Sequence, residues 1–306
     1  MLNAVVVQFY AGMGNTRFTL YVSLATIPLT IVASYGFILG HFGSPILGLS
    51  GITCATLVVQ WILLFSLILI MLLRGTIKKY HIFAAGYLPD LATSKYMLTL
   101  GFPIGIQFGG EIAAMTAGVY MMGHFGETPL AAIQLVSQYT MFVVMIFLGM
   151  SQALSILISE SLGRQDIEMV RRYQQAAMVL FALVCIVMTI FFLGLPGKLI
   201  QFYLGKTATA AFSYYAKIFF ALNVVFLIFD GYRNLFSGAL RGLHDSRIPM
   251  RIGIIALWFL SIPISYLIGF VMHGGPIGLR IGFITGIIYC ACWLWIRLKR
   301  KIHFAV

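Results

Sequence analysis

Long apolar runs dominate the chain, and short polar or glycine-containing segments separate them. Eight runs reach about the 20 residues that a helix needs to cross a bilayer. We predict spans at 18–41, 48–73, 98–122, 129–157, 175–195, 210–237, 250–272 and 276–297. The strict apolar–polar alternation of a membrane β-barrel is absent from these runs. The pattern therefore predicts an all-α polytopic membrane protein, with all eight helices spanning the lipid bilayer.

Composition and charge agree with this prediction. Hydrophobic residues make up 61% of the chain and charged residues 9%, which leaves too little polar surface for a soluble domain. The net charge of +12 arises mainly in alternate loops. When Arg17 is placed in the cytoplasm, nearly all loop Lys and Arg fall on that side, and Lys198 and Lys206 fall on the other. This positive-inside pattern predicts a cytoplasmic C-terminus and accounts for the basicity without nucleic acid.

Three landmarks recur in the same order at a nearly constant offset. GMGNTR at 12–17 resembles GLHDSR at 242–247, SY at 34–35 recurs at 265–266, and HFGSP at 41–45 resembles MHGGP at 272–276. Parallel repeats of this kind are a transporter architecture. Because the second repeat begins near residue 98, an offset of about 230 places the start of the first before Met1. We therefore expect eight of twelve helices here, with about four upstream.

The repeat predicts three parts of the chain. Residues 1–73 are interpreted as the last part of an N-terminal lobe, comprising the end of its fourth helix and its fifth and sixth helices. Residues 74–97 are mixed and basic, with Gly86 and Pro89, as in a cytoplasmic linker. Residues 98–306 are interpreted as a complete C-terminal lobe of six helices.

Two acidic residues, Glu111 and Asp230, lie within predicted spans. An acidic residue at the centre of a membrane helix costs about 2.5–3.5 kcal/mol on insertion scales, so it needs a partner, water or a bound cation. Pairing of Asp230 with Arg233, three residues further on, is the purely structural alternative. Because burial disfavours a bare carboxylate, we interpret the pair as a site for a cation or proton.

Other polar and small residues suggest contacts between helices. Gln134 and Gln138 lie one turn apart and, with Arg233, are candidates to line a cavity shared with Glu111. Hydrogen bonding between helices explains the two glutamines equally well. A stripe of small residues predicts a close helix–helix interface, at Gly101, Gly105, Gly109, Ala113 and Ala117.

The sequence contains no pattern typical of an enzyme or a metal site. Cys54, Cys185, Cys290 and Cys292 lie in apolar runs without disulfide or metal spacing. No phosphate-binding Walker loop and no nucleophile elbow is present. We therefore expect a protein that is not an enzyme and has no cofactor, with Na⁺ or H⁺ as coupling ion.

Three motifs resemble the multidrug and toxic compound extrusion (MATE) family, in its NorM-type branch: SGALRGLHDSRIPM, GFPIGIQFGGEIAAMTAG and SQALSILISESLGRQD. The resemblance runs along essentially the whole chain. It implies a fold of twelve helices in two lobes of six. It also implies an essential glutamate in the first helix of the C-terminal lobe and an aspartate in the fourth, which here are Glu111 and Asp230.

The resemblance further implies an antiporter in the bacterial inner membrane that exports organic cations and drugs in exchange for Na⁺ or H⁺. No nucleic-acid partner and no obligate protein partner is expected. Two alternatives stay open. One is a flippase for a lipid-linked oligosaccharide, which predicts a more basic cavity than one whose deep cation is Arg233. The other is an inactive truncated remnant of such a transporter.

Overall fold

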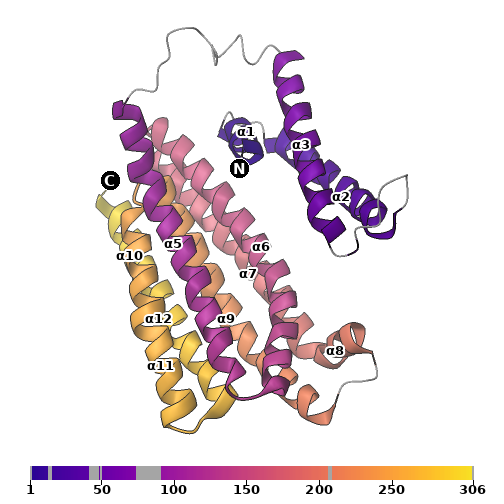
Figure 1. Ribbon diagram of the computed structural model, residues 1–306. Coiled ribbons are helices and arrows are strands. Elements are labelled where there is room, and N and C mark those ends of the chain that lie inside the picture. The colour runs from indigo at the N-terminus through magenta and orange to yellow at the C-terminus, as the bar shows by residue number, and fades with distance from the viewer. Residues whose placement is uncertain are drawn as a thin grey trace. The chain divides into compact units, whose positions relative to one another are not determined.

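The computed structural model describes residues 2–12, 16–40, 48, 50–73, 91–205 and 209–304. These residues form helices and the turns that join them, with no strand among them. The all-α prediction is therefore confirmed. The chain divides into two compact units, Met1–Asp90 and Leu91–Val306, each described by itself below (Figure 1).

The first unit contains three helices, α1 (Leu2–Gly12), α2 (Thr16–Leu39) and α3 (Ser50–Leu73). Asn3 on α1 donates hydrogen bonds to the backbone oxygen and side-chain oxygen of Gln60 on α3, at 2.8 and 2.6 Å. Gly51 brings α3 close to α2, because a Cβ there would lie 2.7 Å from the carbonyl oxygen of Phe37. Pro28 lies inside α2.

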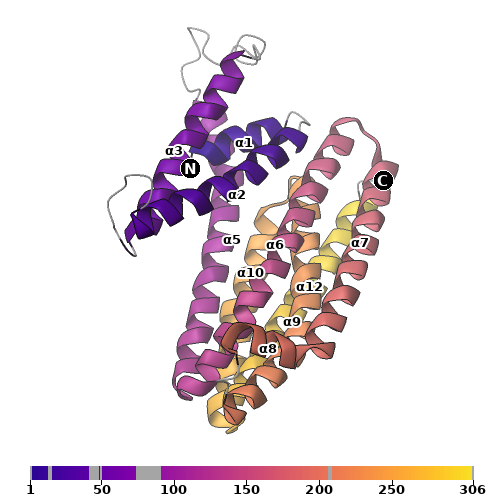
Figure 2. The ribbon, with the colours of Figure 1, turned by 90° about the vertical axis from the view of Figure 1, so that its right-hand side faces the viewer.

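The second unit is a bundle of long helices with one short helix, α8, beside it (Figures 1 and 2). The segment Arg247–Val271 runs as one continuous helical element made of α10, η2, α11 and η3. The elements are α5 (Leu91–Gly123), α6 (Glu127–Gly163), α7 (Ile167–Gly194), α8 (Pro196–Leu204), α9 (Ala210–Gly242), α10 (Arg247–Ile254), η2 (Ile255–Ser261), α11 (Ile262–Tyr266), η3 (Leu267–Val271) and α12 (Gly275–Phe304).

Local contacts mark where several of these helices begin. The hydroxyl of Thr209 accepts the N–H of Phe212 at 3.3 Å and caps α9, and the carboxylate of Asp166 accepts the N–H of Met169 at 3.0 Å and caps α7. Gly126, with φ of 103°, occupies the turn between α5 and α6, where a side chain would be strained. These contacts satisfy backbone donors that the first turn of a helix leaves without partners.

Helix α9 is the centre of the second unit and packs against α6, α7, α8 and α12. Glycines allow the closest approaches. A Cβ on Gly238 would lie 2.5 Å from the carbonyl oxygen of Ser151 on α6, and one on Gly242 would lie 2.7 Å from that of Ser155. A Cβ on Gly231 would likewise overlap the ring of Phe181 on α7. The missing side chains therefore let α9 sit deep between its neighbours.

Glycines also let helix α12 approach the segment Arg247–Val271 closely. A Cβ on Gly282 would lie 2.5 Å from Ser265, and one on Gly278 would lie 3.0 Å from the carbonyl oxygen of Ile268. Two wide π-helical stretches flank the short α11, which begins beside Pro263. Because proline lacks a backbone N–H and crowds the preceding turn, it favours such a local change of helical pitch.

The predicted stripe of small residues on α5 does not pack against this unit. A Cβ added to Gly101, Gly105 or Gly109 would meet no described heavy atom within 4 Å, and these glycines are exposed. The close approaches lie instead on α9 and α12. The stripe identifies a face on which close approach is allowed, but the packing of the whole unit decides which face is covered.

Seven described helical segments are long and apolar enough to cross a membrane, and each matches a predicted span. The eighth predicted span, 98–122, lies in α5, which is helical but less apolar because of Gln107, Glu111 and several glycines. Helix α5 begins at Leu91, seven residues before the predicted span, so 91–97 are helical rather than linker. The remainder of the predicted linker, 74–90, lies outside the described residues.

We predict that Gly238→Ala destabilises the protein by about 1–3 kcal/mol, because the added methyl group overlaps Ser151 on α6. Gly105→Ala on α5 is the matched control and should be neutral or stabilising by up to about 1 kcal/mol, since its surroundings are open. Thermal unfolding of the detergent-solubilised variants measures the difference. Equal midpoints for the two variants would contradict the packing described for α9.

Candidate functional site

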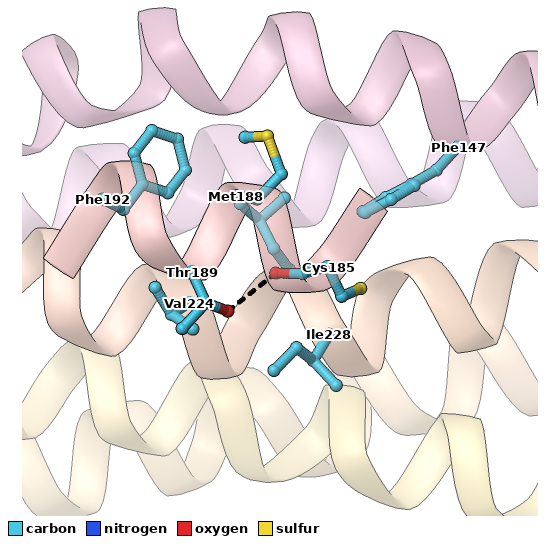
Figure 3. A pocket seen from close by; sticks show the side chains of 8 residues that line it. Phe147, Cys185, Met188, Thr189, Phe192, Val224 and Ile228 are labelled. Atoms are coloured by element: carbon cyan, nitrogen blue, oxygen red, sulfur yellow. Dashed lines mark hydrogen bonds between the residues drawn. The ribbon is translucent and has the colours of Figure 1, made fainter. Parts of the chain in front are cut away.

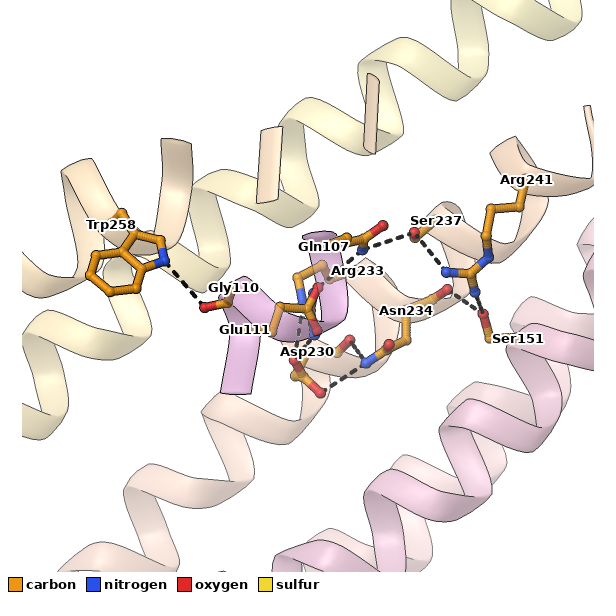
Figure 4. Close-up of polar contacts among 10 residues, drawn as sticks. All are labelled: Gln107, Gly110, Glu111, Ser151, Asp230, Arg233, Asn234, Ser237, Arg241 and Trp258. Carbon is orange, nitrogen blue, oxygen red and sulfur yellow. Dashed lines mark hydrogen bonds and ion pairs between the residues drawn. The ribbon is translucent and has the colours of Figure 1, made fainter. Parts of the chain in front are cut away.

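The two carboxylates of the membrane spans meet at one guanidinium (Figure 4). Arg233 on α9 forms an ion pair with Glu111 on α5, and its Nη2 also donates to Glu111 Oε2 at 3.2 Å. The same guanidinium donates to Asp230 Oδ1 from Nε at 3.0 Å and from Nη2 at 2.8 Å. All three side chains are buried. The structure therefore joins two acids that lie far apart in the sequence through one arginine.

Neutral amides complete the shell of each carboxylate. Gln107, one turn before Glu111 on α5, donates to Glu111 Oε1 at 3.0 Å, and Asn234 donates to Asp230 Oδ2 at 2.9 Å. Both amides lie four residues from their carboxylates, so the helix itself brings them together. Each carboxylate thus accepts hydrogen bonds from a cation and from an amide.

The polar contacts continue along α9 beyond the carboxylates. Gln107 also approaches Ser237 at 3.3 Å, and Arg241 donates to Ser237 at 3.4 Å and to Ser151 on α6 at 3.0 Å. Ser151 in turn donates to the backbone oxygen of Asn234 at 2.6 Å. The result is a connected row of polar side chains between α5, α6 and α9 (Figure 4).

Charge is not balanced within this cluster. The three directly paired side chains, Glu111, Asp230 and Arg233, carry one net negative charge in their ionised forms, and Arg241 adds a positive charge in the same row of polar side chains. Breaking a buried pair by removing one partner typically costs about 3–5 kcal/mol, because an uncompensated charge stays behind. The two acids therefore depend on the one guanidinium that they share.

The pairing of Asp230 with Arg233 that the sequence offered as a structural alternative is confirmed. Arg233 is only 3% exposed and lies between the two acids, because its guanidinium finds its partners on α5 and α9. Its role as a cavity-lining residue stays a prediction. Whether the carboxylates also bind a coupling ion stays a prediction.

Gln134 and Gln138 are placed differently. Both lie on exposed positions of α6, and neither makes a hydrogen bond to another residue that the structure describes. The described partners of Glu111 are Gln107 and Arg233 instead. The structure thus does not join the two glutamines to Glu111, and their role in a shared cavity stays a prediction.

Sequence reasoning missed several members of this site. Gln107 and Asn234 could have been found from the sequence, since each is a polar residue one helical turn from an acid in a membrane span. It also missed a second arginine inside the bundle, which is partly buried. Arg280 on α12 donates to Asn223 Oδ1 on α9 at 2.8 Å, and its guanidinium lies 4.5 Å from the centre of the Phe226 ring. Its position within an apolar span was the signal.

A small hollow between α6, α7 and α9 is a different feature, lined by Phe147, Cys185, Met188, Thr189, Phe192, Val224, Leu227 and Ile228 (Figure 3). Its lining is apolar, and the hydroxyl of Thr189 already donates to the backbone oxygen of Cys185 at 2.8 Å. It is far smaller than the roughly 300–1,000 Å³ of a pocket for a drug-sized ligand. We interpret it as a packing defect of the core.

No group of three or more metal-ligating His, Cys, Asp or Glu residues occurs within the part of the chain that the structure describes. The acidic cluster offers two carboxylates, both already bonded to Arg233. A site for a tightly held transition metal needs more ligands than this.

Comparison with known proteins gives consistent matches. The sequence model of the MatE family matches residues 103–267. Two curated relatives are similar along almost the whole chain, and both are named probable multidrug resistance protein NorM. The one from Bacillus cereus is 29% identical and covers 95% of this chain and 63% of the relative. The one from Agrobacterium fabrum is 27% identical, and the match covers 96% of this chain and 65% of the relative.

Solved structures show the same fold. An outward-facing MATE transporter of the MOP superfamily superposes with a TM-score of 0.86 at 16% identity, over 99% of this chain and 66% of that one. The MATE transporter ClbM, solved with Rb⁺, superposes with a TM-score of 0.74 at 19% identity, over 100% of this chain and 67% of that one. The chain spans less than two thirds of the length of the curated relatives it matches.

We predict that Arg233→Gln destabilises the protein by about 3–5 kcal/mol, because Glu111 and Asp230 are then buried together without a cation. Arg164→Gln is the matched control, since Arg164 pairs with Glu160 at an exposed site, where an ion pair contributes about 0–1 kcal/mol. Thermal unfolding in detergent distinguishes the two variants. Similar losses in both would show that Arg233 is not essential to the buried cluster.

Proposed function

Because this chain belongs to the MatE family, we propose that the protein is a secondary active antiporter that exports organic cations and drugs in exchange for Na⁺ or H⁺. The curated relatives are named multidrug resistance proteins and the solved ones transporters, not enzymes. The seven apolar helical segments make it an integral membrane protein. We place it in the bacterial inner membrane with its C-terminus in the cytoplasm, following the distribution of basic loops.

The observation that carries the proposal is the unbalanced charge of the cluster at Glu111, Asp230 and Arg233. One coupling ion, Na⁺ or H⁺, neutralises the remaining negative charge. Only a ligand with different affinities for two conformations can shift the balance between them. A buried net charge that one conformation shields better than the other provides such a difference. The membrane potential adds about 2.3 kcal/mol per charge per 100 mV.

The location of the cluster supports a conformational role. Glu111 belongs to α5, whereas Asp230 and Arg233 belong to α9, so the ion pair joins two helices. A coupling ion on Glu111 weakens its attraction to Arg233 and loosens α5 from α9. Return of the charge draws the helices together again. In this scheme the ion and the drug are bound in different conformations, which is the requirement for exchange.

The partners of the proposed transporter follow from the same reasoning. Its substrates are small organic molecules, and the lipid bilayer surrounds it. We expect no resident cofactor, no nucleic-acid partner and no obligate protein partner. Aromatic and methionine side chains are frequent, and they form apolar walls that accept cations of varied shape.

A flippase for a lipid-linked oligosaccharide is the second candidate, and one observation favours it. Besides Arg233, the second unit holds Arg241 and Arg280 away from its exposed surface, so it is more basic inside than the sequence predicted. An anionic substrate would fit such groups. The names of the relatives favour drug export, and a transport assay separates the two candidates.

We predict that Asp230→Asn and Glu111→Gln each lower export of a fluorescent organic cation at least tenfold, because each removes the charge that the coupling ion neutralises. Ethidium is added to the medium around everted membrane vesicles from cells that express the reading frame containing this chain, so that export appears as uptake into the vesicles. An imposed Na⁺ gradient or pH gradient then drives transport. Glu160→Gln, at an exposed surface ion pair, should leave transport unchanged.

Normal transport by both acidic variants would refute the coupling site. If neither gradient drives ethidium transport but a lipid-linked oligosaccharide is translocated, the flippase is correct. Protein that inserts into the membrane and transports neither substrate would favour the inactive remnant.

A further inference from the structure

Basic side chains gather where the turn between α9 and α10 meets the last turns of α12. Residues 244–251 and 297–301 hold six lysines and arginines and one acid, Asp245. Asp245 is buried and accepts hydrogen bonds from Arg297 Nε at 3.1 Å and Nη2 at 2.8 Å, and Lys301 Nζ lies 3.7 Å from it. This acid therefore joins the two segments and leaves an excess of positive charge around it.

Two arginines beside this acid are left over. Arg247 and Arg300 are exposed, and neither makes an ion pair with a residue that the structure describes. Arg247 follows Asp245 by two residues, and Arg300 lies three residues from Arg297, so these two are neighbours on α12. The basic patch comprises Arg247, Arg297, Arg300 and Lys301. It brings four positive charges to the single negative charge of Asp245.

The turn between α6 and α7 shows that such an excess is not general. Residues 160–172 hold three arginines and three acids. Arg164 pairs with Glu160 at 2.7 Å and Arg172 with Glu168 at 2.6 Å, all at exposed positions. The predicted topology places this turn on the same side of the membrane as the basic patch. Topology asks for basic residues on that side, but it does not gather them around one acid.

Aromatic side chains on α12 indicate the depth of the basic patch in the bilayer. Trp293 and Trp295 are exposed, and tryptophan and tyrosine are enriched at the level of the lipid headgroups. The ring centres of Tyr289 and Trp293 are 5.7 Å apart, and Lys299 Nζ lies 3.8 Å from the centre of the Trp295 ring. Trp293 lies four residues before Arg297, on the same face of the helix. The basic patch therefore lies at headgroup level.

We propose that the basic patch binds the phosphate of an anionic phospholipid, such as phosphatidylglycerol, in the leaflet that surrounds the C-terminal end of α12. Arginine donors match the oxygens of a phosphate in geometry and charge. Lysines and arginines clustered just outside a membrane span attract anionic lipids. A lipid also brings an acyl chain to the exposed ring of Trp293, which a soluble phosphate does not. The proposal depends neither on the substrate nor on the coupling ion of transport.

The bound headgroup has a structural consequence. Arg247 is the first residue of α10, and Arg300 lies in the last turns of α12. A phosphate that accepts hydrogen bonds from both joins these helix ends from the outside, as Asp245 joins them from within. We therefore expect the lipid to raise the temperature at which the protein unfolds, since it binds only the folded state.

Native mass spectrometry tests the site on detergent-purified protein expressed from the reading frame that contains this chain. The probes are dioleoylphosphatidylglycerol and dioleoylphosphatidylcholine, which share acyl chains and a phosphate but differ in the positive choline. We expect the wild type to bind the glycerol lipid about tenfold more tightly, and Arg247→Gln/Arg300→Gln to lose this preference. Arg164→Gln/Arg171→Gln removes the same charge from the turn between α6 and α7 and should keep it.

Asp245→Asn gives an independent test with the opposite sign. It removes the only acid of the region and frees Arg297 and Lys301, so we expect phosphatidylglycerol to bind about fivefold more tightly. Without lipid the variant should unfold at a lower temperature than the wild type, because its ion pairs are lost. Glu168→Gln, at an exposed ion pair, raises the net charge equally and should leave lipid binding unchanged.

Equal affinities of the wild type for the two lipids would overturn the proposal. So would a preference that survives in folded Arg247→Gln/Arg300→Gln, or one that falls as far in Arg164→Gln/Arg171→Gln, since general surface charge would then explain it. If the first double variant does not fold, Asp245→Asn decides, and binding no tighter than that of the wild type refutes the site. Inorganic phosphate that raises the unfolding temperature as much as the lipid would also refute it.

Discussion

The burial of one arginine between two carboxylates is the interaction on which the second unit depends. Each of the three charges would be costly alone in an apolar bundle, and together they leave a single negative charge. Gln107 and Asn234 complete the carboxylate shells from neighbouring turns. The arrangement therefore stabilises the bundle, and in the proposed antiporter it leaves one charge for the coupling ion. The same contacts serve structure and the proposed coupling.

Helix α9 carries most of this arrangement and brings its polar side chains close to those of the neighbouring helices. It carries Asp230 and Arg233, and its glycines let it approach α6 and α7 closely enough that polar side chains meet inside the bundle. Asn223, two turns earlier on the same helix, holds Arg280. One helix thus carries both the acidic cluster and, about 10 Å along its axis, the amide that holds Arg280. A long helix with a buried face can position charges in this way because its rise per residue is fixed.

The described residues of the candidate coupling site lie within Leu91–Val306. Glu111, Asp230 and Arg233 all come from this unit, so their contacts need no residue from the first unit. The family match also lies within it, at residues 103–267. In the proposed mechanism, ion binding begins within this unit, at the ion pair that joins Glu111 on α5 to Arg233 on α9. The exposed small-residue face of α5 lies on the helix that would move.

The sequence by itself determined the helices, the membrane class and the two acids, because apolar length and the depth of a charge along a helix are local properties. It also contained the pairing of Asp230 with Arg233, which are three residues apart. Only the tertiary structure decided that Glu111 shares this arginine, that α9 and α12 rather than α5 pack through their glycines, and that Arg280 lies against Asn223. Periodicity shows which residues share a face of a helix. It does not show which other helix covers that face, because the packing of the whole bundle decides this.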